Sequence, residues 1–178
     1  ERLHELIDGP IEETAVFRHR PTQPLDPETG QGDSLVALGF AAHRAVCDVD
    51  GELGLVRAVE VATTQDVGRI MNPLALEGQI QGGIAQGLGL ALMEEIQMQD
   101  GRVRNASFTD YLMPTVLDMP PVRMRISETP HPHAPYGLNG VGEMPTIAST
   151  PALVAAVRDA TGRALTRVPL RPSDIAGV

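Results

Sequence analysis

The stretch PLALEGQIQGGIAQGLGLALMEEIQ, residues 73–97, carries the pattern that most strongly decides the expected fold. Large apolar residues recur at every fourth position, which places them on one stripe of an α-helix: Leu76, Ile80, Ile84, Leu88 and Leu92. Pro73 suits the first position of a helix, because a proline there loses no backbone hydrogen bond. The sequence therefore predicts a long helix over 73–97.

Five glycines interrupt this predicted helix: Gly78, Gly82, Gly83, Gly87 and Gly89. Each costs a helix interior roughly 0.8–1 kcal/mol relative to alanine. Something must offset that cost. Either another backbone or a bulky ligand comes very close to the helix, or its first part is not regular helix.

Sequence on either side of this helix predicts a mixture of strands and helices. Residues 42–50 and 55–63 alternate in polarity around the turn residues 51–54, as two strands of a hairpin do. The other expected elements are a hairpin at 96–103, a short helix at 111–117, a strand at 122–128, a long loop at 129–146, a helix from Thr150-Pro151 to Ala160 ended by Gly162, and a strand at 165–170.

Because these elements do not alternate regularly as βαβ units, the expected class is α+β: a mixed sheet with a long Gly-rich helix and a second, C-terminal helix. Residues 1–33 are rich in proline and are expected to form an extended N-terminal arm. Residues 34–178 are expected to form the folded domain. The first residue is Glu1 rather than Met, which fits a chain cut from something longer.

Composition argues against several classes of function. The net charge is −9, with no basic cluster beyond Arg18-His19-Arg20, so nucleic acid is not an expected partner. Cys47 is the only cysteine and cannot by itself form a disulfide or hold an iron–sulfur cluster. No apolar run approaches the ~20 residues that span a bilayer, and no signal peptide is found. A cytoplasmic location is expected.

Three segments could carry chemistry but favour plainer interpretations. His131-Pro-His133 offers two potential metal ligands without a third nearby, so exposed loop histidines are favoured and no metal ligand is expected. The glycines of 82–89 lack the Lys-Ser/Thr of a phosphate-binding loop, which leaves tight packing as the simplest role. Residues 66–73 favour a structural turn with Asn72 as a helix cap.

The fourth candidate is Glu143 in Asn139-Gly-Val-Gly-Glu-Met-Pro145. A glutamate in such a loop is usually an ordinary surface residue. However, glycines on its N-terminal side let the backbone approach a bulky ligand closely. A carboxylate held in a pocket can have its pKa raised towards working pH, which a general base needs. The residues permit this role without requiring it.

Taken together, the motifs resemble the molybdenum-binding subunit of the xanthine dehydrogenase/aldehyde oxidase family, most closely bacterial xanthine dehydrogenases. The resemblance covers roughly residues 20–175 and rests on segments in a fixed order: Leu25–Gly32, Asp66–Pro73, Glu77–Gly89, Gly140–Glu143 and Thr150–Gly162. Asn139 and Met144 depart from the Lys and Pro common at those positions, which bears on substrate detail.

The resemblance implies roles at three positions. Glu143 matches the family's active-site glutamate, the general base of an oxidative hydroxylation at the molybdenum centre. Gly142 matches backbone beside the metal, and Gln79 matches a glutamine that hydrogen-bonds the pterin of the molybdenum cofactor. This cofactor, as molybdopterin or its cytosine dinucleotide form, would be the bulky ligand that the glycine-rich segment needs.

The resemblance further implies the C-terminal catalytic portion of a molybdenum hydroxylase, an oxidoreductase expected to turn hypoxanthine and xanthine into urate in purine catabolism. The rest of the molybdenum-binding portion, 2Fe-2S clusters and FAD would lie on partner domains or subunits of a multi-subunit complex. The chain alone is expected to be inactive. Two alternatives stay open: the same chemistry on an aldehyde or another N-heterocycle, and a non-catalytic scaffold that keeps the fold.

Overall fold

The computed structural model describes residues 9–177 and divides the chain into two units, with the boundary between Val36 and Ala37. In the first unit the described residues 9–36 contain no helix or strand. Asp26 organises a turn there: its Oδ1 atom accepts from the amides of Glu28 and Thr29, each at 2.8 Å. Arg20 pairs with the Asp33 carboxylate and brings the two sides of this turn together. The boundary between 33 and 34 expected from the sequence stays a prediction.

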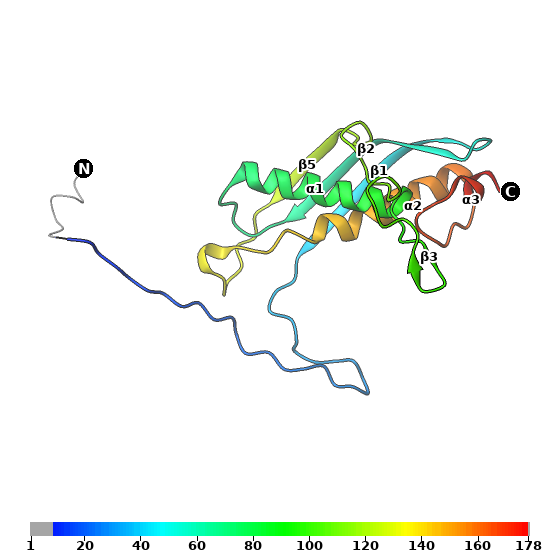
Figure 1. Ribbon diagram of the computed structural model, residues 1–178. Coiled ribbons are helices and arrows are strands. Elements are labelled where there is room, and N and C mark those ends of the chain that lie inside the picture. The colour runs from blue at the N-terminus through cyan, green and yellow to red at the C-terminus, as the bar shows by residue number, and fades with distance from the viewer. Residues whose placement is uncertain (1–8, 178) are drawn as a thin grey trace. The chain divides into compact units, whose positions relative to one another are not determined.

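A three-stranded mixed sheet forms the base of the second unit (Figure 1). Strand β1 (Phe40–Asp50) runs antiparallel to β2 (Leu55–Asp66), and β2 runs parallel to β5 (Val122–Ser127). The predicted hairpin is confirmed, with Gly54 at φ +70° in its turn. The predicted strand at 122–128 is also confirmed within one residue.

Two helices cover one face of this sheet: α1 (Pro73–Leu92) and α2 (Met144–Thr161) (Figure 1). Side chains of β1 alternate strictly between half-buried and exposed, as expected when only one face of a sheet is covered. Three clusters of buried side chains fill the space between sheet and helices: Ala58, Leu88, Ala91 and Leu153; Val157, Leu165, Leu170 and Ile175; and Val61, Ile80 and Ile84. The predicted α+β class is confirmed.

Helix α1 is regular from its first turn, and the close approach of other atoms accounts for three of its glycines. A Cβ at Gly83 would lie 2.6 Å from the Cβ of Pro145, and one at Gly87 would lie 2.5 Å from the Cβ of Ser149. A Cβ at Gly89 would meet Glu94 and Pro114. Helix α2 is therefore the close neighbour at Gly83 and Gly87. By contrast, Gly78 and Gly82 meet nothing within 4 Å of the Cβ position.

The predicted start of the second helix was wrong. Helix α2 begins at Met144, six residues before the expected cap at Thr150, and Pro151 lies inside it. Pro145 supplies the fixed φ that suits a first turn, and the Thr150 hydroxyl donates to the Gly87 carbonyl of α1 at 3.0 Å instead of capping its own helix. The predicted end is confirmed, because Gly162 has a left-handed φ of +66°.

Three other local predictions failed. Residues 93–97 do not continue α1, residues 111–117 form no helix, and residues 165–170 form no strand. Leu170 instead donates its amide to the carbonyl of Ala91 at 2.8 Å. The predicted hairpin at 96–103 is present as the two-residue strands β3 (Met98–Gln99) and β4 (Arg102–Val103). Two short helical turns were not predicted: η1 (Pro135–Gly137) and α3 (Pro172–Ala176).

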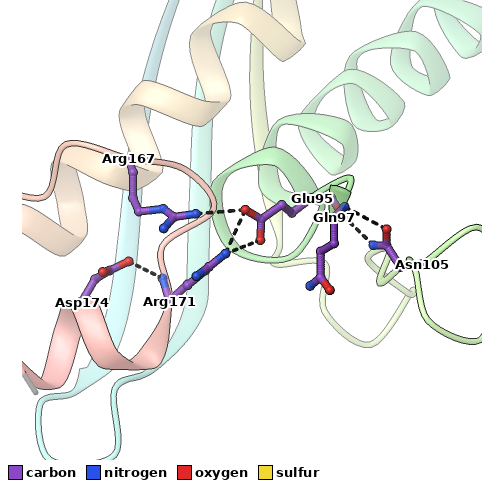
Figure 2. A network of polar contacts seen from close by, with 6 residues as sticks. All are labelled: Glu95, Gln97, Asn105, Arg167, Arg171 and Asp174. Carbon is purple, nitrogen blue, oxygen red and sulfur yellow. Dashed lines mark hydrogen bonds and ion pairs between the residues drawn. The ribbon is translucent and has the colours of Figure 1, made fainter. Parts of the chain in front are cut away.

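A polar network joins the segment after α1 to the C-terminal segment (Figure 2). The Glu95 carboxylate accepts from Arg167 at 2.9 Å and from Arg171 at 2.8 Å. The hydrogen bond from Arg171, which outweighs the opposing desolvation, holds the pKa of Glu95 below its ordinary value. Asn105 joins from the other side, because its side chain bonds to the backbone of Glu95 and of Gln97.

Candidate functional site

Two segments far apart in the sequence meet at the N-terminal end of α1. They are the turn at 67–72, which leads from β2 into α1, and the loop at 129–143, which leads from β5 into α2. The backbone joins them directly: Arg69 donates to the Gly137 carbonyl at 2.9 Å, and Asn139 donates to the Val67 carbonyl at 3.2 Å. The loop that ends at Glu143 is therefore anchored to the turn that starts α1.

Gly68 makes this anchoring possible. Its φ is +64°, in the left-handed region that side chains other than glycine rarely adopt. A Cβ at this position would lie 2.4 Å from the carbonyl oxygen of Gly137 and 2.7 Å from the amide nitrogen of Asn139. The Asp66-Val-Gly sequence thus has a geometric reason for its glycine, which the sequence analysis did not single out.

Asp66 holds the other end of the same loop. Its Oδ1 atom accepts from the amides of Gly68 and Thr129, each at 3.2 Å. Desolvation raises the pKa of Asp66, but these bonds outweigh it and leave the pKa below its ordinary value. The predicted cap is confirmed as well, since the Asn72 side chain accepts from the amide of Ala75 at 3.0 Å. The 66–73 segment is the structural turn predicted from the sequence, with Asn72 as the helix cap.

Gln79 and Gly142 lie beside each other. Gln79 is an exposed residue on the second turn of α1, and its Oε1 atom lies 3.7 Å from where a Cβ of Gly142 would be. That separation is an ordinary van der Waals contact. Two of the three predicted site residues are thus neighbours, although 63 positions of sequence separate them.

Glu143 follows Gly142 directly and occupies the N-cap position of α2. Its side chain makes no capping hydrogen bond and is exposed. Its backbone carbonyl accepts from Thr146 and Ile147, each at 3.1 Å, so the first turn of α2 fixes the residue's backbone. Within residues 9–177 nothing encloses the carboxylate, so the burial that would tune it as a base must come from outside these residues.

A shallow depression of about 200 Å³ lies next to this pair and is formed by the same two segments. Its lining includes Arg69, Asn72, Gln79, Asn139 and Val141. The remaining lining side chains are apolar. An apolar hollow with a few polar groups at its edge is typical of sites that bind small molecules.

No metal-binding cluster of three His, Cys, Asp or Glu side chains is found in residues 9–177. His131 and His133 lie in the same loop with ring centroids 6.1 Å apart and their rings edge to face. The amide of His133 donates to Nδ1 of His131 at 3.2 Å, which turns that nitrogen towards the backbone.

A buried polar cluster under the first turns of α2 was not predicted from the sequence. His43 on β1, Gln65 on β2 and Ser149 on α2 are joined by hydrogen bonds, and Gln65 and Ser149 have no exposed surface. One signal was available. His43 occupies an inward position of the alternating strand at 40–50, where only apolar residues and Cys47 otherwise stand.

Comparison with known proteins identifies relatives over nearly the whole chain. A family described as "Molybdopterin cofactor-binding domain" matches residues 2–120. A probable xanthine dehydrogenase subunit of Bacillus subtilis is 37% identical over 167 residues, and the match covers 94% of this chain and 22% of that protein. The large chain of carbon monoxide dehydrogenase from Afipia carboxidovorans is 34% identical over 122 residues, which cover 68% of this chain and 15% of that protein.

Among solved structures, the aldehyde oxidoreductase from Desulfovibrio gigas matches with a TM-score of 0.81 and 30% identity. That match covers 88% of this chain and 17% of the oxidoreductase chain. The chain therefore spans between 15% and 22% of the length of these proteins. At identities of 30% to 37% the similarity indicates a shared family as well as a shared fold.

Proposed function

The chain belongs to the molybdopterin cofactor-binding domain family of the molybdenum hydroxylases, and on that basis we propose that it is the C-terminal catalytic portion of such an enzyme. Glu143 is the proposed general base, and Gln79 and Gly142 are the proposed cofactor-binding residues. One observation carries this proposal furthest: a Cβ built on Gly142, the residue before the glutamate, would lie 3.7 Å from the amide oxygen of Gln79, so the two residues are neighbours.

The exposed groups at the site fit a pterin cofactor. The Gln79 side chain offers both a donor and an acceptor, which suits the amide-like edge of a pterin ring. Gly140 meets nothing within 4 Å of its Cβ position, and Gly142 meets only Gln79. A large flat ligand can therefore approach the backbone of Gly140 and Gly142 closely, with Gln79 beside it.

The bound cofactor supplies the redox chemistry, and the protein places and tunes the reacting groups. The Glu143 carboxylate accepts a proton as the substrate is hydroxylated. The Gln79 side chain would hold the cofactor by donating to it and accepting from it, which would fix the orientation of the cofactor. The first turn of α2 holds the Glu143 backbone, and the contact of the loop with the 67–72 turn sets its distance from Gln79.

The remaining parts of the enzyme lie outside these 178 residues. We propose that the rest of the molybdenum-binding portion, 2Fe-2S clusters and FAD reside on partner domains or subunits, and that the chain alone is inactive. Residues 1–33 are proposed as an arm and residues 34–178 as the cofactor-binding domain. No helix in residues 9–177 is long and apolar enough to cross a membrane. A cytoplasmic location is proposed.

Hypoxanthine and xanthine are the proposed substrates, with urate as product. The 37% identity to the probable xanthine dehydrogenase subunit of Bacillus subtilis over 94% of the chain supports this choice. The second candidate keeps the chemistry but oxidises an aldehyde or another N-heterocycle, and the TM-score of 0.81 with an aldehyde oxidoreductase favours it. A non-catalytic scaffold is the third possibility, against which the retention of Glu143 argues.

Glu143→Ala tests the base assignment in the assembled enzyme. We expect turnover to fall at least 10²-fold, because positioned acid–base groups contribute roughly 10²–10⁴-fold. Molybdenum per enzyme should be unchanged, because Glu143 is not proposed to hold the cofactor. Metal analysis and steady-state kinetics measure the two quantities. Glu52→Ala in the exposed β1–β2 turn is the matched control and should keep full turnover.

Near-normal turnover of the Glu143→Ala enzyme at full molybdenum loading would refute the base assignment. Steady-state kinetics of the unmodified enzyme would determine the substrate class. Values of kcat/KM for hypoxanthine and xanthine that exceed those for aldehydes and other N-heterocycles support the purine assignment, and the reverse order supports the second candidate. Full molybdenum loading without activity on any class would support the scaffold.

A further inference from the structure

The buried cluster under α2 contains a histidine that the proposed chemistry does not use. His43 is half-buried and points from β1 towards α2, where its Nδ1 atom lies 3.1 Å from the Ser149 hydroxyl. Ser149 is fully buried, and its hydroxyl donates to the carbonyl of Pro145. Pro145 lies in the first turn of α2, two residues after Glu143.

These contacts fix the tautomer of His43. A serine hydroxyl has one hydrogen, which here goes to the Pro145 carbonyl, so the Ser149 oxygen must accept from His43. The hydrogen of the neutral ring therefore sits on Nδ1. The other nitrogen, Nε2, lies 3.4 Å from the Gln65 amide nitrogen, which donates to it. The result is a directed chain of hydrogen bonds from the sheet to the first turn of α2.

Gln65 favours the same arrangement. Its Nε2 atom also donates to the Thr63 hydroxyl at 3.1 Å, while its buried Oε1 atom has no partner. If the Gln65 amide were reversed, its NH2 group would take the position in which the oxygen now has no partner. Two buried donors without partners would cost more free energy than one such acceptor. The amide therefore keeps a donor directed at His43 and favours an unprotonated Nε2.

The same serine also touches the helix that carries Gln79. A Cβ at Gly87 of α1 would lie 2.5 Å from the Ser149 Cβ, so the two helices meet in close contact at this point. One turn earlier, Gly83 makes the same kind of contact with Pro145. Sheet, α1 and the first turn of α2 therefore meet at Ser149, and His43 is its hydrogen-bond donor.

We propose that His43 is a positioning residue: as the Nδ1–H tautomer it donates to Ser149 and so fixes the first turn of α2, with Glu143 at its start, against Gln79 on α1. This rests on the proposed function for its catalytic consequence. The structural part, that His43 fixes the first turn of α2, can be tested without activity.

Hydrogen exchange in the assembled enzyme tests the structural part. The amides of Thr146 and Ile147 both donate to the Glu143 carbonyl, so their exchange reports on the first turn. His43→Phe removes both ring nitrogens and should speed their exchange roughly tenfold, the effect of losing one buried hydrogen bond. His43→Asn keeps a donor near the Nδ1 position and should restore the slow exchange. Exchange near Thr161 should stay unchanged in both variants.

A matched pair of hydroxyl deletions covers the case in which His43→Phe does not assemble. Ser149 and Thr161 each donate to the carbonyl four residues earlier in α2, Thr161 to Val157 at 2.8 Å. Ser149→Ala should speed exchange at the first turn, whereas Thr161→Val should not. Exchange that is unchanged at the first turn in both His43→Phe and Ser149→Ala, or raised equally along the whole helix, would overturn the proposal.

Turnover per bound molybdenum tests the catalytic consequence. His43→Phe should lower kcat roughly tenfold with molybdenum content unchanged, since small displacements of reacting groups are costly, and His43→Asn should recover most of it. A wild-type kcat in His43→Phe, despite faster exchange at 146–147, would overturn the link to catalysis. If Glu143→Ala were fully active while exchange followed the pattern above, the base assignment would fail and the structural role of His43 would stand.

Discussion

Glycines occur in both halves of α1, but those in one half are closely packed and those in the other half are open. In its C-terminal half, a Cβ at Gly83 or Gly87 would overlap atoms of α2. In its N-terminal half, Gly78 and Gly82 meet nothing within 4 Å of the same position. Packing explains the first pair, because it removes side chains that would hold two helices apart. Packing within the described residues does not explain the second pair.

This difference separates the structural from the functional part of one helix. Glycine in a helix interior that gains no contact costs about 0.8–1 kcal/mol, and nothing in residues 9–177 offsets it at Gly78 and Gly82. Gly78 directly precedes Gln79 in the sequence, and Gly82 follows it three positions later. The proposed cofactor, or the polypeptide that would enclose it, is the partner that we propose for the open half of α1.

The largest effect of a substitution on stability is expected in the closely packed C-terminal half of α1. Gly87→Ala places a Cβ 2.5 Å from the Ser149 Cβ and 3.1 Å from the Thr146 carbonyl oxygen, and backbone cannot move aside cheaply. Overpacking of this kind should lower the free energy of unfolding by about 1–3 kcal/mol, even after the gain in helix propensity. Urea unfolding of the full chain measures it. An unfolding midpoint equal to or above that of the wild type would contradict the close contact.

A smaller effect of opposite sign is expected at the open end. Gly82→Ala adds a methyl group that meets nothing, so the chain should gain about 0.5–1 kcal/mol in stability from helix propensity. The same urea titration provides the measurement, with Gly87→Ala as its counterpart. In the assembled enzyme the substitution sharpens the comparison: reduced molybdenum content would point to a ligand over this face. Destabilisation of the chain would show that the face is already covered.

The sequence predicted the elements whose pattern reflects local physics. The alternation in 42–50 and 55–63 and the four-residue recurrence in 73–92 depend only on which face is buried, and all three segments have the expected structure. Turns with obligatory glycines, such as Gly54 and Gly162, were also recognisable. These signals lie within a few residues of the structure that they specify.

The failures arose where distant contacts decide the conformation. Thr150-Pro151 has the appearance of a helix start, yet Pro145 starts the helix six residues earlier and Thr150 bonds to α1. Residues 165–170 were predicted as a short strand, but Leu170 bonds to the carbonyl of Ala91, Arg167 pairs with Glu95, and the segment forms no strand. The loop sequence made Glu143 a candidate, and the roles of Gln79, Gly142 and Glu143 came from family resemblance. Their proximity depends on Gly68 and the 129–143 loop, which no local pattern reveals.

The smallest predicted effect is the contribution of His43 to the pH dependence of the free energy of unfolding. Burial lowers the pKa of His43 below its ordinary 6.5, so folding favours the neutral ring. Its two hydrogen-bond partners, Gln65 on β2 and Ser149 on α2, carry no charge. Arg44, Arg123 and Arg125 are the charged residues that line the same surface hollow as His43, and desolvation is the cause of its lowered pKa.

A histidine whose pKa is lower in the folded than in the unfolded state contributes stability above the unfolded value. That contribution is lost as the pH falls from about 6.5 through the folded-state value. Between pH 7 and 5 the free energy of unfolding should therefore decline in the wild type more steeply than in His43→Asn, which cannot take up this proton. Carboxylates with lowered pKa values, such as Asp66 and Glu95, titrate below this window and leave the difference to His43. Equal slopes in the two proteins would mean that His43 is as accessible to protons in the folded chain as in the unfolded one. The directed chain of hydrogen bonds through Ser149 would then lose its basis.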